Sequence, residues 1–375
     1  MIIAIPKETL AGESRVSVIP STVDRLVKKG AQVIIETGLG LSIGFSDEDY
    51  KKSGATVEND RQHLLSQGDI VLRLRKPPMD EVGQLKKDSI HISFLDPFNE
   101  KDLVNALARN NITAISIEMI PRTTRAQKMD ALSSQANLAG YVAVILAAER
   151  LPKIFPMLMT PAGTISPARV FIIGAGVAGL QAIATAKRLG ARVEAFDTRA
   201  VVKEQVQSLG AKFIEIDLGE TGQTKDGYAK ALTPEQLAIQ RQGMAKVCAQ
   251  SDVVITTAQL FGRKAPVVIG KDMLSQMKPG TIIVDMAVES GGNVEGSLVN
   301  EEVVTENGVR ILGLGNLPGR VAVNASQMYS ANLHNLLEEY WDKDAKKFNL
   351  NLEDEIIKGC VVTHDGKIVN AMLTK

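Results

Sequence analysis

A glycine-rich turn between a short apolar run and a helical stretch is the sequence feature that most constrains the fold. Residues 174–179 are Gly-Ala-Gly-Val-Ala-Gly and directly follow the apolar run Val170–Ile173. The spacing G-x-G-x-x-G in a strand-to-helix context is typical of dinucleotide-binding α/β domains. Gly174 allows a tight turn, Gly176 lets a pyrophosphate approach the backbone, and Gly179 lets helix and strand pack closely. The alternative is a glycine-rich turn without a ligand.

An acidic residue follows the next apolar run at the spacing that such a domain uses for ribose. Asp197 comes directly after Arg192–Phe196, within the ~20 residues expected after the glycine turn. A carboxylate there accepts hydrogen bonds from the ribose hydroxyls and repels a 2′-phosphate, which favours NAD(H) over NADP(H). Arg199 lies two residues further on and could pair with a phosphate instead. By itself, Asp197 is also compatible with a solvated acid at a strand end.

Short apolar runs alternate with helical stretches along the chain, which predicts parallel sheets covered by helices. A length of 375 residues favours two domains. The first series of strands begins at Ile2–Ile5, and the second begins at Arg169. A helical stretch from Ala131 to Arg150 lies between the two series. Ser21 is expected to cap an early helix that closes at Gly30, and Thr233 to cap a later one.

We therefore expect an α/β protein with two Rossmann-like, doubly wound parallel-sheet domains separated by a nucleotide-binding cleft. Residues 1–132 with 320–375 are expected to form the first domain, because the amphipathic stretch from Ala325 to Trp341 needs a partner face. Residues 133–319 are expected to form the NAD(H)-binding domain. The charged tail from Asp342 has no clear pattern.

Composition excludes several classes of protein. The 43 basic and 43 acidic residues balance, so no overall field favours nucleic acid, and no nucleic-acid partner is expected. Two cysteines, Cys248 and Cys360, are too few for a disulfide framework. The four histidines have no metal-ligand spacing, and no metal is expected. No apolar run approaches the ~20 residues of a membrane span, so a soluble, cytoplasmic chain is expected.

A polar loop rich in arginine precedes the long helical stretch. Its polar residues are Arg122, Arg125, Gln127, Asp130, Ser133 and Ser134. One interpretation is a solvated loop with a helix cap at Asp130. The other is a clamp for nicotinamide, because glutamine and serine match the donors and acceptors of a carboxamide and an Arg–Asp pair would hold the loop in shape. On spacing alone both interpretations remain open.

No triad or proton relay is visible among the histidines and cysteines. A dehydrogenase acting on a hydroxyl or amine must move a proton and needs a general acid or base. Direct hydride exchange between two nicotinamide rings moves no proton at the reacting carbons and needs only positioning and exclusion of water. Lysine or aspartate could still serve as the base.

Three segments together resemble the NAD(H)-binding alpha subunits of proton-translocating NAD(P) transhydrogenases in their short form without membrane segments. They are PRTTRAQKMDALSSQANLAGY at 121–141, GAGVAGLQAIATAKRLGARVEAFDTR at 174–199, and KPGTIIVDMAVESGGN at 278–293. The first segment is close to a signature, whereas the second alone indicates only a Rossmann domain. The resemblance extends over nearly the whole chain.

The resemblance implies a set of site residues. Four that surround the nicotinamide are Arg122, Gln127, Asp130 and Ser133. Those implied to hold the rest of the NAD(H) are Gly174, Ala175, Gly176, Val177, Gly179, Asp197, Thr198, Arg199, Gln240 and Gln259, together with Gly227 and Tyr228. The last two lie in a glycine-rich, polar stretch, Leu218 to Leu232, that resembles a loop closing over bound nucleotide.

The resemblance also implies an activity and partners. The expected reaction is hydride transfer from NADH on this chain to NADP⁺ on a partner subunit, coupled to proton translocation by a membrane-spanning subunit. A homodimer is expected, attached through its partners to the cytoplasmic face of the inner membrane. The coupling machinery is not in this chain.

Two other functions remain open. Alanine dehydrogenases resemble the chain at its opening residues, including Lys7, Glu8 and Arg15. Their catalytic lysine and histidine correspond here to Arg75 and Asp96, which argues against amino-acid oxidation because arginine stays protonated. The other alternative is a nucleotide-binding regulatory module without catalysis. One departure from the transhydrogenase pattern, Gln259–Gly262, puts local nucleotide contacts in doubt.

Overall fold

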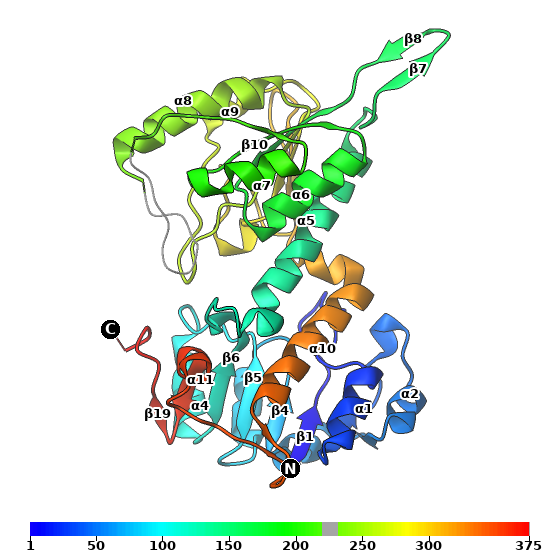
Figure 1. The fold of residues 1–375 in the computed structure, drawn as a ribbon, viewed down its shortest axis with the longest axis vertical. Coiled ribbons are helices and arrows are strands. Elements are labelled where there is room, and N and C mark those ends of the chain that lie inside the picture. The colour runs from blue at the N-terminus through cyan, green and yellow to red at the C-terminus, as the bar shows by residue number, and fades with distance from the viewer. Residues whose placement is uncertain (220–231, 375) are drawn as a thin grey trace. The chain divides into compact units, whose positions relative to one another are not determined.

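The computed structural model describes residues 1–219 and 232–374. By its internal contacts the chain divides into two compact units, Met1–Gln135 with Gly319–Lys375, and Ala136–Pro318. Each unit has a sheet in which parallel pairs predominate, covered by helices (Figure 1). The expected α/β class with Rossmann-like sheets is confirmed.

The first unit contains an eight-stranded sheet in the order β19-β18-β6-β5-β4-β1-β2-β3. Its strands are β1 (Ile2–Ile5), β2 (Gln32–Glu36), β3 (Thr56–Glu58), β4 (Ile70–Leu72), β5 (Ile90–Ser93), β6 (Thr113–Ser116), β18 (Val361–His364) and β19 (Lys367–Ile368). Its helices are α1 (Pro20–Lys28), α2 (Asp47–Lys52), α3 (Arg61–Gln67), α4 (Lys101–Arg109), α10 (Ala322–Glu339) and α11 (Glu355–Cys360). The strands from β1 to β6 are parallel, and their side chains are mostly buried.

The expected cap at Ser21 is wrong. Helix α1 begins at Pro20, with Ile19 in the N-cap position, and Ser21 is exposed inside the first turn. Proline is favoured at the first helical position because its missing N–H has no partner there in any case. The expected end is correct, since Gly30 follows the helix with a φ of 88°.

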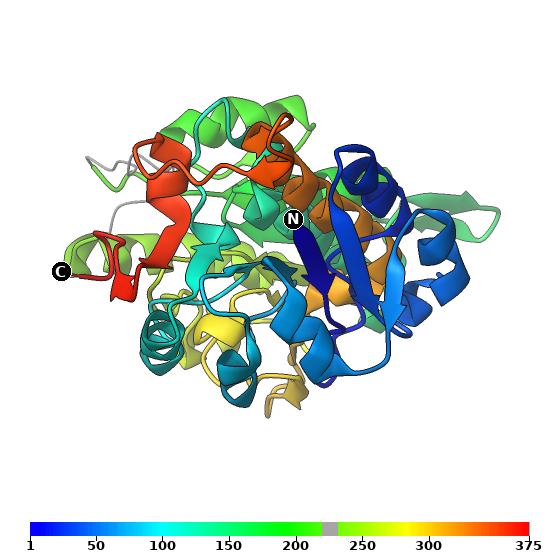
Figure 2. The same ribbon diagram turned by 90° about the horizontal axis from the view of Figure 1, so that it is seen from below.

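The C-terminal segment joins the N-terminal strands in this unit (Figures 1 and 2). Strand β18 pairs antiparallel with β6, and α10 packs beside α1. Serines on α10 accept the N–H groups of Val16 and Ile19 at 2.9 and 3.1 Å. The tail also forms a short ribbon, β16 (Trp341–Asp342) with β17 (Lys347–Phe348). The sequence pattern left this tail undefined because its strands are too short to show a period.

The second unit contains a seven-stranded sheet in the order β11-β10-β9-β12-β13-β15-β14. Its strands are β9 (Arg169–Ile173), β10 (Arg192–Phe196), β11 (Lys212–Phe213), β12 (Val253–Thr256), β13 (Ile282–Asp285), β14 (Glu301–Val304) and β15 (Arg310–Gly313). Its helices are α6 (Val177–Arg188), α7 (Lys203–Ser208), α8 (Pro234–Gln250) and α9 (Lys271–Leu274). Strand β14 runs antiparallel to β15, and the other pairs of this sheet are parallel. The strand order reverses beside β9, the point where open α/β sheets bind ligands.

Helix α5 (Ala131–Arg150) runs from the first unit into the second and has the expected bounds. It begins after Asp130, whose carboxylate accepts the N–H of Ser133 at 2.8 Å and so caps the helix. By length and composition alone, α5 could cross a membrane, but half of its most apolar stretch is buried within the protein. The search for uninterrupted apolar runs did not single this helix out.

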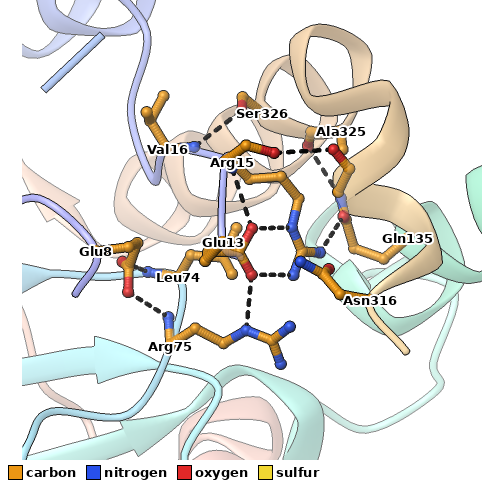
Figure 3. Close-up of polar contacts among 12 residues, drawn as sticks. Glu8, Glu13, Arg15, Val16, Leu74, Arg75, Gln135, Asn316, Ala325 and Ser326 are labelled. Carbon is orange, nitrogen blue, oxygen red and sulfur yellow. Dashed lines mark hydrogen bonds and ion pairs between the residues drawn. The ribbon is translucent and has the colours of Figure 1, made fainter. Parts of the chain in front are cut away.

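A buried ion network lies in the first unit (Figure 3). The carboxylate of Glu13 accepts hydrogen bonds from Arg15 Nε and Nη2 at 2.8 and 2.7 Å and from Arg75 Nε at 2.8 Å. Arg15 also donates to Gln135 on α5 at 2.8 Å. Burial alone would raise the pKa of Glu13, but the bonds and charges of the two arginines lower it to about 2. The carboxylate is therefore ionised at neutral pH.

We predict that Glu13→Gln lowers the free energy of unfolding of the first unit by about 3 kcal/mol at pH 7, because it leaves a buried arginine without its counter-charge. The folded-state pKa lies below the ordinary 4.5, so this stabilisation is present above pH 4.5 and is lost as the pH falls toward 2. Urea unfolding followed by fluorescence of Trp341, the single tryptophan, measures the difference. The exposed Glu353→Gln is the control, and an equal effect of both substitutions would contradict the prediction.

Candidate functional site

The glycine turn lies between β9 and α6 in the second unit, and each glycine answers a different steric demand. Gly174 has a φ of 98°, a backbone conformation that side chains disfavour. A Cβ on Gly179 would lie 1.9 Å from the carbonyl oxygen of Gly174, so only glycine allows the helix to start this close to the strand. A Cβ on Gly176 would meet no atom of the described residues within 4 Å, so the space above this backbone is open.

Helix α6 presents an uncapped end at this open space. Its N-cap position is Gly176, and no side chain among the described residues caps the first turn. Free N–H groups and the positive end of the helix dipole favour an anionic ligand there. From α5, Gly140 lets the two helices approach, because a Cβ on it would lie 2.2 Å from the carbonyl oxygen of Ala178.

Asp197 lies at the end of β10 and is tied to the glycine turn. Its Oδ2 accepts the N–H of Ala175 at 2.7 Å, and its Oδ1 accepts the N–H of Arg199 at 2.8 Å. The guanidinium of Arg199 donates to both carboxylate oxygens, at 2.9 and 2.7 Å. Asp197 is therefore an oriented acceptor whose lone pairs are filled by Arg199. A ribose would need this guanidinium to move aside.

The loops after β12 and β13 form the next part of this sheet edge. The buried carboxylate of Asp285 accepts the N–H groups of Ala287 and Asn293 at 3.0 and 2.9 Å. Asn293 in turn exchanges hydrogen bonds with the backbone of Ala258 at 3.0 and 2.8 Å. The two loops are thereby locked together. Sequence reasoning missed this aspartate and asparagine, although both lie in the segment 278–293 that carries the family resemblance.

The remaining residues expected near the nucleotide have varied surroundings. Gln259 is exposed and donates to the carbonyl oxygen of Met286 at 3.3 Å. Gln240 is buried within α8, and its Oε1 has no hydrogen-bond partner in the described part of the chain. Thr198 follows Asp197 and is half-buried. Gly227 and Tyr228 lie outside the described residues.

The four residues expected to surround the nicotinamide belong to the first unit. Arg122 and Gln127 are exposed on the loop before α5. Asp130 and Ser133 are brought together, since the hydroxyl of Ser133 donates to Asp130 Oδ2 at 2.6 Å. The expected Arg–Asp pair within the loop is not formed by Arg125, which pairs with Asp354 instead. The expected site residues are therefore divided between the two units.

The positions that would carry acid–base chemistry in an alanine dehydrogenase are changed in geometry as well as in type. Arg75 is engaged with Glu13, and Asp96 is exposed, with a φ of 52° and a hydrogen bond from Asn99 at 2.8 Å. His91 is fully buried, and burial lowers its pKa to about 3. Among residues 1–219 and 232–374, no cluster of three side chains could hold a metal ion.

Buried charge is the feature that sequence reasoning missed most completely. Glu8 accepts the N–H of Leu74 at 2.7 Å, and Glu118 accepts that of Leu95 at 2.8 Å. Burial raises the pKa of both carboxyl groups. Arg73 is also buried and pairs with Glu81. The sequence contains only the hint that these charged residues directly follow or adjoin predicted strands.

Comparison with known proteins gives two adjacent family matches. The family model described as "Alanine dehydrogenase/PNT, N-terminal domain" matches residues 4–139, and "Alanine dehydrogenase/PNT, C-terminal domain" matches residues 143–371. The chain is 46% identical to an NAD(P) transhydrogenase subunit alpha of Rhodospirillum rubrum, covering 100% of this chain and 99% of that protein. It is 30% identical to an alanine dehydrogenase of Halomonas elongata, covering 98% and 94%. A solved transhydrogenase structure from Sinorhizobium meliloti matches 98% of this chain and 100% of its own, with a TM-score of 0.88 and 42% identity.

We predict that Asp197→Asn reduces the preference for NADH over NADPH about tenfold, because the charge that repels a 2′-phosphate is removed. Fluorescence titration with the two reduced nucleotides measures both dissociation constants. Glu204→Gln, an exposed acid on α7, is the matched control and should leave the ratio unchanged. A ratio unchanged in Asp197→Asn would show that this carboxylate does not choose the nucleotide.

Proposed function

Because the chain belongs to the alanine dehydrogenase/PNT family, we propose that it is the NAD(H)-binding subunit of a proton-translocating NAD(P) transhydrogenase. In this role it holds NADH while hydride passes directly to NADP⁺ on a partner subunit. The observation that carries the proposal is the joined glycine turn and Asp197, an anion-binding helix end hydrogen-bonded to a ribose-type acid. The relatives named transhydrogenase subunit alpha support the choice of reaction.

The open backbone over Gly176 fits a pyrophosphate, which needs close approach and N–H donors. We propose that Ala175, Val177 and the first turn of α6 hold it. Asp197 then takes the adenosine ribose, and the displaced guanidinium of Arg199 is free to lie against the adenine. Thr198, Gln240 and Gln259 remain proposed contacts, as do Gly227 and Tyr228.

The nicotinamide is assigned to the loop before α5. NADH supplies the hydride from its nicotinamide ring. The task of the chain is to orient that ring: Gln127 and Arg122 offer exposed amide and guanidinium groups, and Asp130 and Ser133 fix the end of the loop. No proton moves at the reacting carbons, so a site without an accessible acid or base suffices. Arg75, held by Glu13, and the buried His91 agree with this requirement.

The membrane partner and the location follow from the same proposal. The chain is assigned to the cytoplasmic face of the inner membrane, attached through a membrane-spanning subunit that carries the proton pathway. The NADP(H)-binding subunit supplies the hydride acceptor. The assay that tests the proposal measures reduction of NADP⁺ by NADH with and without those partners. Activity that needs the partners supports it, and reduction of NAD⁺ by alanine with this chain alone would replace it with the alanine dehydrogenase function.

We predict that Gln127→Asn slows hydride transfer in the reconstituted complex by ~100-fold, because small displacements of a reacting group are costly. NADH binding should weaken only modestly, since the adenosine and pyrophosphate contacts are untouched. Stopped-flow transfer beside equilibrium binding separates the two quantities. Gln62→Asn, an exposed glutamine on α3 of the first unit, is the control. A wild-type rate in Gln127→Asn would end the nicotinamide assignment.

A homodimer is also part of the proposal, and the hairpin of β7 (Leu158–Thr160) and β8 (Gly163–Ile165) is the surface that supports it. This hairpin extends away from the sheet of its unit (Figure 1). Its apolar side chains are exposed, Met159 by 76% and Met157 by 58%. A hollow of about 990 Å³ at its base is lined by apolar groups, including Phe155. Exposed apolar surface of this kind marks protein contacts.

We predict that Met159→Asp shifts the protein from dimer to monomer at micromolar concentration, because a charge would be buried at the interface without a partner. Sedimentation velocity measures the change. Met79→Asp, at a residue 51% exposed in the first unit, should leave the dimer intact. A monomeric wild-type protein, or a dimer unaffected by Met159→Asp, would contradict this use of the hairpin.

A further inference from the structure

The second arginine of the proposed nicotinamide loop has no role in holding the nucleotide, yet it contacts side chains from the far end of the chain. Arg125 Nη2 donates to the hydroxyl of Tyr340 at 3.1 Å and to the carboxylate of Asp354. The hydroxyl of Tyr340 donates to Asp354 Oδ1 at 2.7 Å. The three side chains form one closed cluster in the first unit, which we call the loop clamp. It joins the loop to residues 215 and 229 positions further along the sequence.

The acidic member of the loop clamp is itself fixed. Asp354 caps α11, accepting the N–H of Ile356 at 2.9 Å. Partial burial would raise its pKa, but the hydrogen bonds from Tyr340 and Arg125 lower it to about 2, so it is ionised at neutral pH. The ring of Tyr340 packs edge-on against Phe348 with centroids 5.9 Å apart. The clamp therefore offers Arg125 a rigid anion rather than a mobile surface acid.

Further contacts hold the same loop to α10. Asn332 and Asn335 donate to the carbonyl oxygen of Lys128 at 3.0 and 2.8 Å. Ala126 and Met129 are completely buried. Gln127 lies between these anchored positions and is exposed. Arg125 precedes them and governs the approach of the chain from Arg122 to Gln127.

We propose that Arg125 is a positioning residue, and that the loop clamp of Arg125, Tyr340 and Asp354 fixes the direction in which Arg122 and Gln127 present their polar groups. This inference rests on the proposed function, which places the nicotinamide at those two residues. An isolated exposed ion pair contributes little, but here one guanidinium is shared between a phenol and a carboxylate that is already a helix cap. Its loss releases the loop near the ring and leaves the contacts to adenosine and pyrophosphate intact.

The test compares rate with affinity. Arg125→Ala is expected to slow hydride transfer in the reconstituted complex by ~10-fold, because the loop retains its other anchors and the loss of orientation is partial. The dissociation constant for NADH should change less than ~2-fold. Arg125→Lys keeps the charge and should recover part of the rate. Arg109→Ala, an exposed arginine at the end of α4 in the same unit, is the control.

A double-mutant cycle separates a clamp from general loosening. Asp354→Asn retains an oxygen for the cap of α11 but loses the charge. Combined with Arg125→Ala, it should slow transfer no more than the slower single variant, since both remove one interaction. Additive effects would overturn the proposal, as would a wild-type rate in Arg125→Ala or an equal loss of NADH affinity.

A second measurement keeps the clamp distinct from the proposed function. Hydrogen exchange of residues 121–130 in the protein without its partners should quicken in Arg125→Ala and not in Arg109→Ala. If the wild-type complex transfers no hydride while this difference is present, the proposed function fails and the clamp stands as a device that orders the loop. Unchanged exchange in Arg125→Ala would overturn the clamp whatever the activity.

Discussion

Helix α6 can begin where it does only because a hydrogen atom, rather than a methyl group, stands at Gly179. A Cβ there would lie 1.9 Å from the carbonyl oxygen of Gly174, a clash that no rotamer change relieves because the oxygen belongs to the backbone. The close start brings the N–H groups of α6 to the end of β9. It also lets Asp197, at the end of β10, accept the N–H of Ala175. The turn, the helix end and the acid therefore form one rigid assembly.

The first unit has a different physical basis. Its sheet edge is organised by buried charges rather than by bare backbone: Glu13 between two arginines, and Glu8 and Glu118 against backbone N–H groups. Such groups are costly to bury unless every partner is present. The same network reaches α5 through Gln135, directly after the proposed nicotinamide loop. A loop supported in this way by Arg15, Asp130 and Arg125 is suited to orienting a ring rather than to exchanging protons.

Much of the local structure could be predicted from the sequence. The glycine turn, Asp197 at its strand end, the bounds of α5 and the Thr233 cap with Pro234 all follow from spacing and residue type. The cap at Ser21 failed because Pro20 is itself a good first helical residue. The binding roles of the site residues stay predictions. What could not be predicted depends on contacts between distant residues. Strands of two to four residues in the tail are defined only by pairing, as β18 pairs with β6. Arg125 was expected to serve an Arg–Asp pair within its own loop, but its partner, Asp354, lies 229 residues away.

The central claim is that hydride passes directly between two nicotinamide rings without a proton relay in this chain. The measurement that tests it most directly uses NADH carrying deuterium at the transferred position, with NADP⁺ and the reconstituted partners. Mass spectrometry of the NADPH formed should find the deuterium retained in full, in ordinary water and without any other substrate. Loss of the label to solvent, or turnover that requires an amino acid or oxo acid, would contradict the account.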